Sequence, residues 1–294
     1  VFFVWSMSCF AKKESCSQSN LQKIAKSLQM FAGRSSPNIL ESRIIKRKAH
    51  YIKWHGKIDV KGTLKPIETT YYYYKTRNIE KGKKAPLLFV FSGVGGITLL
   101  ERYIANYFTK RGVSVVLTEF MEIRDLDSIQ TLQPKLLRSI KSALGLVDYF
   151  STFKDIDQDK MSAIGISFGG FRTLYLMGLD MRIKGATIVV AGSSFARALA
   201  YSTLPFIRKI RELQMAYTGI TRIEDYIAEL EKSLTIKPTD LLCRRSKDDF
   251  FLYMAYKDSV VPYSLQEDLW HRLDTPFVKR VKFGHYGGAL YFGM

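Results

Sequence analysis

The sequence Gly-Ile-Ser-Phe-Gly occupies residues 165–169 and directly follows a short apolar run at residues 161–164. This spacing is typical of a strand that turns sharply into a helix and presents a serine at the turn. Glycines are required two residues to either side because the strained turn leaves no room for β-carbons there. A helical apolar pattern over residues 168–178 supplies the expected context. A glycine-rich turn can match this motif by chance. Ser167 is therefore a candidate nucleophile, and the assignment requires a general base and an orienting carboxylate elsewhere in the chain.

A serine hydroxyl needs a histidine to accept its proton, and the chain has four histidines. His50 and His55 lie in a basic, hairpin-like segment, and His271 lies in a predicted surface helix. His285 stands in a glycine-flanked loop directly after the strand-like residues 277–283. His285 is therefore the candidate general base.

A carboxylate must orient that histidine, and it is expected between the serine and the histidine in chain order, where a strand ends. Residues 250–256 have the composition of a buried strand, and Asp258 lies in the turn that leaves it. Taken singly, Asp258 is equally a turn-capping residue and His285 an ordinary loop residue. Three matches in the required order predict a catalytic triad of Ser167, Asp258 and His285.

Acyl transfer also needs donors for the oxyanion of the tetrahedral intermediate. The backbone N–H of Phe168 is the first candidate. The second is the backbone N–H of Val94, in the glycine-rich residues 92–96 that follow the strand-like residues 87–91. The alternative for this loop is a tight turn without a catalytic role. A phosphate-binding loop fits less well, because no Gly-Lys-Ser/Thr sequence follows.

With these residues in place, the chain resembles the α/β-hydrolase superfamily, especially its esterase and dienelactone-hydrolase-like members, over about residues 45–294. The resemblance implies an α/β fold with a mostly parallel central sheet and helices on both faces, an acyl-enzyme mechanism and no cofactor. Many relatives carry His-Gly where this chain has Ser92-Gly93. The hydrogen bonding of the oxyanion loop is therefore expected to differ.

The remaining patterns favour the same architecture. The apolar patterns predict buried strands at residues 113–118 and 186–190, and helices at residues 97–110 and 134–150. Strands that alternate with helices predict right-handed crossovers and a sheet covered on both faces. Residues 50–57 and 69–77 are predicted to form an antiparallel pair at the edge of the sheet.

The segment of about residues 193–240 is too long for a plain loop and is predicted to be a helical cap. Residues 194–217 read as one helix, and a capping box that begins at Thr221 opens a second helix that ends at Leu234. An insertion here lies above the carboxyl ends of the strands, where it shapes a substrate pocket. Residues 41–294 are thus expected to form one catalytic domain that includes this cap.

The formal net charge of +18 raises the question of nucleic acid. The basic residues are spread along the chain without a recognised nucleic-acid motif, so we expect a solvated basic surface and no nucleic-acid partner. The charge favours acidic substrates or peripheral contact with anionic membranes. The sequence contains no run of eighteen or more apolar residues, so it predicts no membrane-spanning helix.

Residues 1–40 are expected to be an export-signal remnant or a flexible segment, because an apolar start leads through small residues to Cys9 and a polar stretch. Residues 6–9 distantly resemble a bacterial lipoprotein cleavage box, which would place a lipidated Cys9 at the cell envelope. The alternative is the frayed start of a cytoplasmic enzyme. Cys16 and Cys243 are predicted to form neither a disulfide framework nor a metal site, with Cys243 a core thiol.

The sequence therefore predicts a serine hydrolase that acts on a carboxylic ester or a related small acyl compound, without a cofactor or metal. Peptidase, thioesterase or acyltransferase activity would use the same three residues. The alternative of another class is a non-catalytic binding or envelope scaffold that retains the fold.

Overall fold

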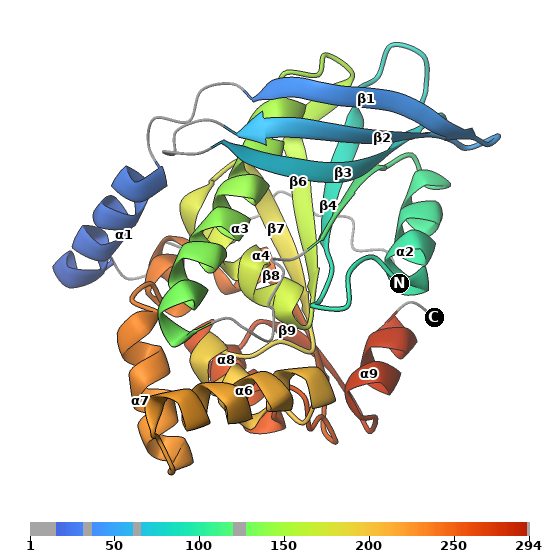
Figure 1. The fold of residues 1–294 in the computed structure, drawn as a ribbon. Helices are drawn as coiled ribbons and strands as arrows, with labels where there is room; N and C mark the ends of the chain where they lie inside the picture. Colours follow the sequence, from blue (N-terminus) through green and yellow to red (C-terminus); the bar gives the residue numbers. More distant parts are fainter. Residues whose placement is uncertain (1–15, 32–36, 61–65, 120–127, 293–294) are drawn as a thin grey trace.

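A computed structural model of the protein describes residues 16–31, 37–60, 66–119 and 128–292. Within them, a nine-stranded sheet has the order β1-β2-β3-β5-β4-β6-β7-β8-β9 (Figure 1). The pairs β1·β2, β2·β3 and β3·β5 are antiparallel, and the remaining neighbours are parallel. The strands are β1 (Asn38–Arg47), β2 (Tyr51–Val60), β3 (Ile67–Thr76), β4 (Ala85–Phe91), β5 (Ser114–Thr118), β6 (Ile156–Ile166), β7 (Ile183–Val189), β8 (Phe250–Ala255) and β9 (Phe277–Val281). The predicted mostly parallel sheet is confirmed.

Helices cover both faces of the sheet (Figure 1). They are α1 (Gln18–Phe31), α2 (Leu99–Thr109), α3 (Ile129–Phe150), α4 (Phe168–Leu179), α5 (Phe195–Tyr201), α6 (Pro205–Thr218), α7 (Ile223–Ser233), α8 (Tyr263–Arg272) and α9 (His285–Phe292). The α/β architecture with helices on both faces is confirmed.

Strand β4 shows why the parallel strands read as continuous apolar runs. Leu87, Phe89 and Phe91 belong to the larger apolar cluster, which contains residues of α3 and α4. Leu88 and Val90 belong to a second cluster, which contains residues of α2 and α9. Because alternate side chains of a strand point to opposite faces, a strand covered on both faces is apolar at every position.

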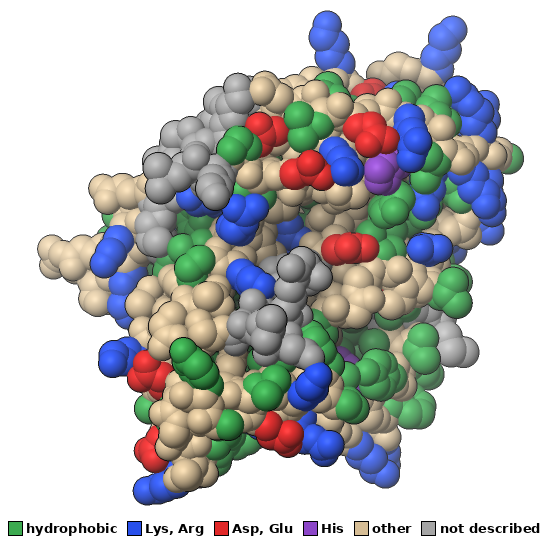
Figure 2. All heavy atoms as spheres, in the orientation of Figure 1, with side chains coloured by type: hydrophobic (Ala, Val, Ile, Leu, Met, Phe, Trp, Pro, Cys, Tyr) green, Lys and Arg blue, Asp and Glu red, His purple; other side chains and the backbone are tan. Residues whose placement is uncertain are grey.

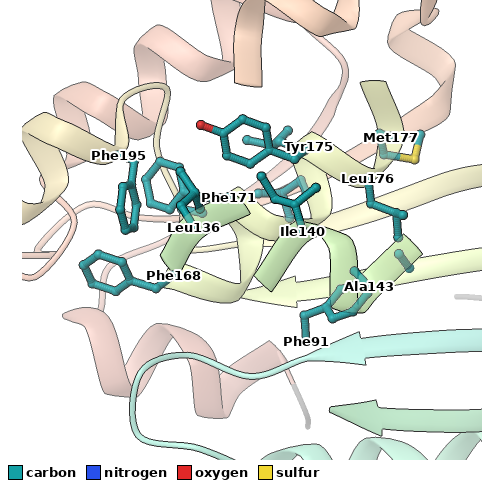
Figure 3. Packing of buried hydrophobic residues seen from close by; sticks show 14 of the residues in the cluster. Phe91, Leu136, Ile140, Ala143, Phe168, Phe171, Tyr175, Leu176, Met177 and Phe195 are labelled. Carbon is teal, nitrogen blue, oxygen red and sulfur yellow. The ribbon is translucent and has the colours of Figure 1, made fainter. Parts of the chain in front are cut away.

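Aromatic packing joins the helix after Ser167 to the segment that the sequence predicts to be a cap. The rings of Phe168 and Phe171 in α4 lie 5.6 Å and 5.3 Å from the ring of Phe195 in α5, measured between centroids. Figure 3 shows these three rings together, with Ile140 and Ala143 of α3 on the same side of the sheet. The start of the cap is therefore packed against the element that begins beside Ser167.

The antiparallel end of the sheet differs from expectation at its edge. The predicted pair is present as β2 and β3, but β1 pairs with β2 and forms the edge. Strand β1 is exposed or half-exposed along its whole length and carries two register irregularities. A strand that buries neither face has no period of two in its hydrophobicity, so the sequence pattern did not reveal it.

The cap also differs in detail. The single helix expected over residues 194–217 is broken into α5 and α6, because Pro205 begins a new helix after an extended junction at residues 202–204. Helix α7 has Arg222 rather than Thr221 as its N-cap and lacks the predicted capping box. Leu234 follows the last residue of α7, as expected.

The prediction of a flexible segment up to residue 40 does not fit the described part of that range. Ile24 and Phe31 of α1 are buried in the main core, and β1 begins at Asn38. Because α1 is amphipathic, its apolar side packs on the core and fixes this part of the chain. Residues 1–15, which include Cys9 and the signal-like start, lie outside the described residues.

The prediction for the two other cysteines was wrong. Cys16 and Cys243 form a disulfide, with their Cα atoms 5.4 Å apart across a sequence separation of 227 residues. Beside it, the Nζ of Lys23 in α1 lies 3.1 Å from a carboxylate oxygen of Asp240 in the 3₁₀ helix η1 (Pro238–Arg244). The pairing of distant cysteines depends on tertiary structure, so the sequence did not reveal it.

Lys and Arg side chains are scattered among Asp and Glu on the face shown in Figure 2. None of the helices in the described ranges is both long enough and apolar enough to cross a membrane.

Candidate active site

Ser167 lies between the last residue of β6 and the first residue of α4. Its backbone has φ 55° and ψ −124°, which is a strained conformation for a residue with a side chain. The Ser167 N–H donates to the carbonyl of Val189 in β7 at 2.8 Å, which anchors the turn to the sheet. The strand, strained turn and helix that the sequence predicted are therefore present.

The two flanking glycines are required by close contacts. A β-carbon at Gly165 would lie 2.3 Å from the Thr173 hydroxyl oxygen, and one at Gly169 would lie 2.2 Å from the Phe91 carbonyl oxygen. Both separations are shorter than any normal contact. Glycine at these positions lets α4 approach β4 and β6 closely enough to hold Ser167 at the carboxyl edge of the sheet.

His285 and Asp258 complete a chain of hydrogen bonds. The Nε2 of His285 lies 2.8 Å from the Ser167 Oγ, and the Nδ1 lies 2.8 Å from the Asp258 Oδ2. A carboxylate can only accept, so Nδ1 carries the proton of the neutral ring and Nε2 is free to accept from the serine hydroxyl. All three residues are buried, with exposed fractions of 6%, 8% and 7% for Ser167, His285 and Asp258. The structure thus brings together the three residues that the sequence singled out.

His285 differs from expectation in one respect. It is the first residue of α9 rather than part of a loop. The glycines around it disguised the helix, since glycine lowers helix propensity. A β-carbon at Gly288 would lie 2.8 Å from the Ala255 side chain, so the small residue lets α9 lie close to the end of β8.

Asp258 is held by more donors than His285 alone. Its Oδ1 accepts from the backbone N–H groups of Val260 and Val261, each at 2.9 Å. Its Oδ2 also accepts from the Gln266 Nε2 at 2.9 Å. Gln266 is a polar contact that the sequence interpretation missed. The available signal was a glutamine between Leu265 and Leu269 on the buried face of α8.

The loop of residues 92–96 passes directly over the serine. A β-carbon at Gly93 would lie 3.4 Å from the Ser167 Cβ and 3.7 Å from its Oγ. The Gly93 carbonyl accepts from the Gly96 N–H at 3.2 Å and closes a turn that contains Val94. The Ser92 hydroxyl oxygen is buried and has no hydrogen-bond partner among the described residues. The loop has the expected position, and the donor roles of Val94 and Phe168 stay predictions.

A cavity of about 390 Å³ adjoins His285. It is lined by Thr203, Leu204, Pro205, Ser259, Val260, Gly284, His285, Tyr286 and Gly287. The lining thus combines the junction of α5 and α6 with the loop after Asp258 and the start of α9. The segment that the sequence predicts to be a cap thus contributes a wall beside His285.

No protein-family profile matches the chain, and no curated protein sequence matches it. Solved structures with the same architecture do match. Acetyl xylan esterase 1 from Thermoanaerobacterium sp. JW/SL YS485 superposes with a TM-score of 0.67 at 15% identity, over 95% of this chain and 93% of that one. An acetyl xylan esterase from Paenibacillus sp. R4 gives 0.71 at 13% identity, over 96% of each chain. The chain has the α/β-hydrolase fold.

A third match shows how widely this α/β-hydrolase fold is shared. The acylaminoacyl peptidase of Pyrococcus horikoshii superposes with a TM-score of 0.56 at 14% identity, over 88% of this chain and 48% of the peptidase. At such identities the likeness concerns the fold, and function has to be argued from the site.

The other histidines of the chain lie in other surroundings. The Nε2 of His50 lies 2.8 Å from the Asn106 Oδ1, and the Nδ1 of His55 lies 3.6 Å from a Glu41 oxygen. His271 is exposed at the end of α8. Across the described ranges, no three His, Cys, Asp or Glu side chains are grouped as metal ligands would be.

Arg172 is a buried cation in the helix that follows Ser167. Its guanidinium donates to the Ser142 hydroxyl at 3.0 Å and to the Glu119 carbonyl, and it lies 4.8 Å from the centre of the Phe91 ring. Burial lowers the pKa of Arg172 to about 9. These contacts tie α4 to α3 and to β4, so we interpret Arg172 as a structural residue of this fold.

Proposed function

We propose that this chain is a serine hydrolase that cleaves a carboxylic ester or a related acyl substrate. The observation that carries the proposal is the pair of 2.8 Å contacts that His285 makes, through Nε2 to the Ser167 Oγ and through Nδ1 to the Asp258 Oδ2. This arrangement supplies a nucleophile, a general base and a group that orients the base.

In the acylation step, the Ser167 Oγ attacks the substrate carbonyl carbon while its proton passes to the His285 Nε2. Asp258 stabilises the resulting imidazolium through Nδ1–H. The carbonyl oxygen becomes an oxyanion, for which the N–H groups of Phe168 and Val94 are the proposed donors. The tetrahedral intermediate then expels the alcohol, whose oxygen takes the proton from Nε2.

In the deacylation step, water takes the place of the alcohol. His285 removes a proton from the water as it attacks the acyl-enzyme, and it returns that proton to Ser167 as the carboxylic acid leaves. Strain in the Ser167 backbone supports this role, because sparsely populated backbone conformations concentrate at functional sites.

The cavity beside His285 supports a substrate rather than a purely structural role for the triad residues. Since His285 delivers the proton to the leaving group, we propose that the alcohol part of the substrate occupies this cavity. Leu204, Pro205 and Val260 give it apolar walls, which favour an apolar or amphipathic alcohol. The non-catalytic scaffold has no comparable observation in its favour, and it becomes an outcome of the test.

The test is covalent labelling with a fluorophosphonate probe, followed by peptide mass spectrometry. We expect labelling at Ser167, and we expect it to disappear in Ser167→Ala and to fall by at least about 1,000-fold in rate in His285→Ala. Ser194→Ala is the matched control, because Ser194 is also a serine at the N-terminus of a helix, but its Oγ accepts from the Arg197 N–H. Circular dichroism checks that each variant is folded.

Unlabelled wild-type protein is then assayed with matched ester, thioester and anilide substrates of one acyl group. Preference for the ester supports the proposed class, and preference for the anilide or thioester assigns peptidase or thioesterase activity instead. A folded wild-type protein that is not labelled at Ser167 contradicts the hydrolase and supports the scaffold.

A further inference from the structure

Gln266 donates a hydrogen bond to Asp258 Oδ2, the same oxygen that His285 contacts. Its side chain is fully buried, with an exposed fraction of 0%. Its Nε2 donates to the Asp258 Oδ2 at 2.9 Å and to the Val261 carbonyl at 2.8 Å, and its Oε1 accepts from the Ala255 N–H at 3.1 Å. Both amide protons and the amide oxygen are therefore used, and none of the three contacts is to solvent.

The orientation of this amide is fixed by its neighbours. The Ala255 N–H can only donate, so the atom that faces it must be the amide oxygen. A reversed amide would place its NH₂ group against that N–H, and its oxygen against the Asp258 carboxylate and the Val261 carbonyl. Two acceptors facing each other in a buried site are strongly unfavourable, so the NH₂ group stays on Asp258.

Among the described residues, Gln266 and His285 are the two side chains that hydrogen-bond to the Asp258 carboxylate. Within the described residues, its ion pair is with His285, and its remaining partners are Gln266 and the N–H groups of Val260 and Val261. The backbone donors hold Oδ1, while Oδ2 is shared between the His285 Nδ1 and the Gln266 Nε2. Removal of Gln266 would leave the position of Oδ2 to the histidine alone.

We propose that Gln266 is a positioning residue that aligns the Asp258 carboxylate with His285. The inference rests on the proposed function. Gln266 acts in two ways: it restricts rotation of the carboxylate, and it withdraws part of the negative charge on Oδ2 from the imidazole. The first effect maintains the orientation of Nε2 towards Ser167, and the second sets how readily the imidazole releases its proton.

Two variants test this role. Gln266→Met keeps the length of the side chain but removes both polar groups, and Gln266→Asn keeps the amide but shortens its reach by one methylene. Gln214→Met is the matched control, since Gln214 is also buried, with 4% exposure, and its Oε1 accepts from the Tyr226 hydroxyl at 2.6 Å within the cap. If Gln266→Met does not fold, Gln266→Asn is measured in its place.

The first measurement is the rate of fluorophosphonate labelling at Ser167 as a function of pH. We expect the plateau rate of Gln266→Met to fall roughly 10- to 100-fold, the range for the loss of a hydrogen bond to a charged group. We also expect the acid limb of the profile to move to higher pH, because a carboxylate that has lost a donor holds the imidazole proton more tightly. Gln214→Met should keep the wild-type profile.

The second measurement does not depend on activity. In protein labelled with ¹⁵N-histidine, the Nδ1–H resonance of His285 is identified by its loss in His285→Ala. We expect this resonance to shift in Gln266→Met and in Gln266→Asn, and to stay in place in Gln214→Met. A merely structural role for Gln266 would lower stability without a selective change at this proton.

The outcomes separate the inference from the proposed function. A wild-type profile and an unmoved His285 resonance in both Gln266 variants overturn the inference, even when Ser167 is labelled. Absence of labelling in the wild-type protein overturns the proposed function, while the resonance still decides whether Gln266 aligns Asp258 with His285.

Discussion

Thr203 and Ser259 are joined by two hydrogen bonds. The Thr203 N–H donates to the Ser259 carbonyl at 3.1 Å, and the Thr203 hydroxyl donates to the Ser259 hydroxyl at 2.9 Å. Thr203 lies between α5 and α6, and Ser259 directly follows Asp258. The wall of the cavity and the loop that carries the acid are therefore coupled by direct contact.

Replacement of Thr203 by Val removes the side-chain hydrogen bond and preserves the shape of the residue. We expect a loss of about 0.5–1.5 kcal/mol in the free energy of unfolding, because one hydrogen bond is lost. We also expect a rise in KM with little change in kcat, since the cavity wall is loosened while His285 keeps its partners. Steady-state kinetics and urea unfolding measure both. Thr218→Val is the control, because the Thr218 hydroxyl bonds, among the described residues, to carbonyls of its own helix. An equal rise in KM in that variant would contradict the coupling.

Leu204 offers a direct test of the cavity as the site of the leaving group. We expect Leu204→Trp to lower kcat/KM for esters of bulky alcohols by about tenfold or more, and to affect methyl esters much less, because filling a pocket discriminates by size. The comparison uses a series of esters with one acyl group. Leu213→Trp is the control, since Leu213 is an exposed residue of α6, the helix that follows Leu204, and does not line the cavity. Equal losses along the whole series would place the leaving group elsewhere.

The parallel sheet and the three residues at its carboxyl edge could be predicted, because apolar periodicity locates the strands and chain order locates the residues that follow them. Ser167, Asp258 and His285 each follow a strand of the parallel sheet. Parallel strands end at the same edge, so residues far apart in sequence were expected to meet there. The edge strand β1 has no buried face and left no comparable pattern.

Gln266 and the Cys16–Cys243 disulfide depend on contacts that the sequence does not encode locally. The role of Gln266 arises because α8 returns its buried face to the turn that contains Asp258. The disulfide arises because α1 packs beside η1, and its two cysteines are 227 residues apart in the sequence. In both cases tertiary packing determines which residues meet, and neither the hydrophobic period nor the spacing of motifs predicts that contact.

The disulfide should make a measurable contribution to stability. We expect the Cys16→Ala, Cys243→Ala double variant to lose about 2–4 kcal/mol in the free energy of unfolding, because the bridge constrains a long loop in the unfolded chain. Urea unfolding with and without dithiothreitol measures this, and the variant should be insensitive to the reductant. A wild-type protein whose stability does not change on complete reduction would rule out this contribution.

Alkaline pH should destabilise the fold through its buried tyrosines. Burial raises the pKa of Tyr74 and of Tyr253 to about 12, and it also raises the pKa of Tyr71 and Tyr73. A group whose pKa is higher in the folded state contributes stability that is present below the unfolded value of about 10 and is lost as the pH rises towards 12. Urea unfolding at a series of pH values from 9 upwards, with a spectrophotometric titration of tyrosinate, follows both effects. Tyr74→Phe should make the decline shallower.

On the proposed mechanism, the position of His285 at the start of α9, after β9, makes activity depend on that helix. Ser167 and Asp258 are already present in a nascent or proteolytically shortened chain that stops after β9. Such a chain would retain every strand of the sheet and yet lack the base. The protein would then stay inert towards acyl compounds until α9 has been synthesised and has docked, and proteolytic removal of α9 would abolish activity while leaving the nine described strands in place.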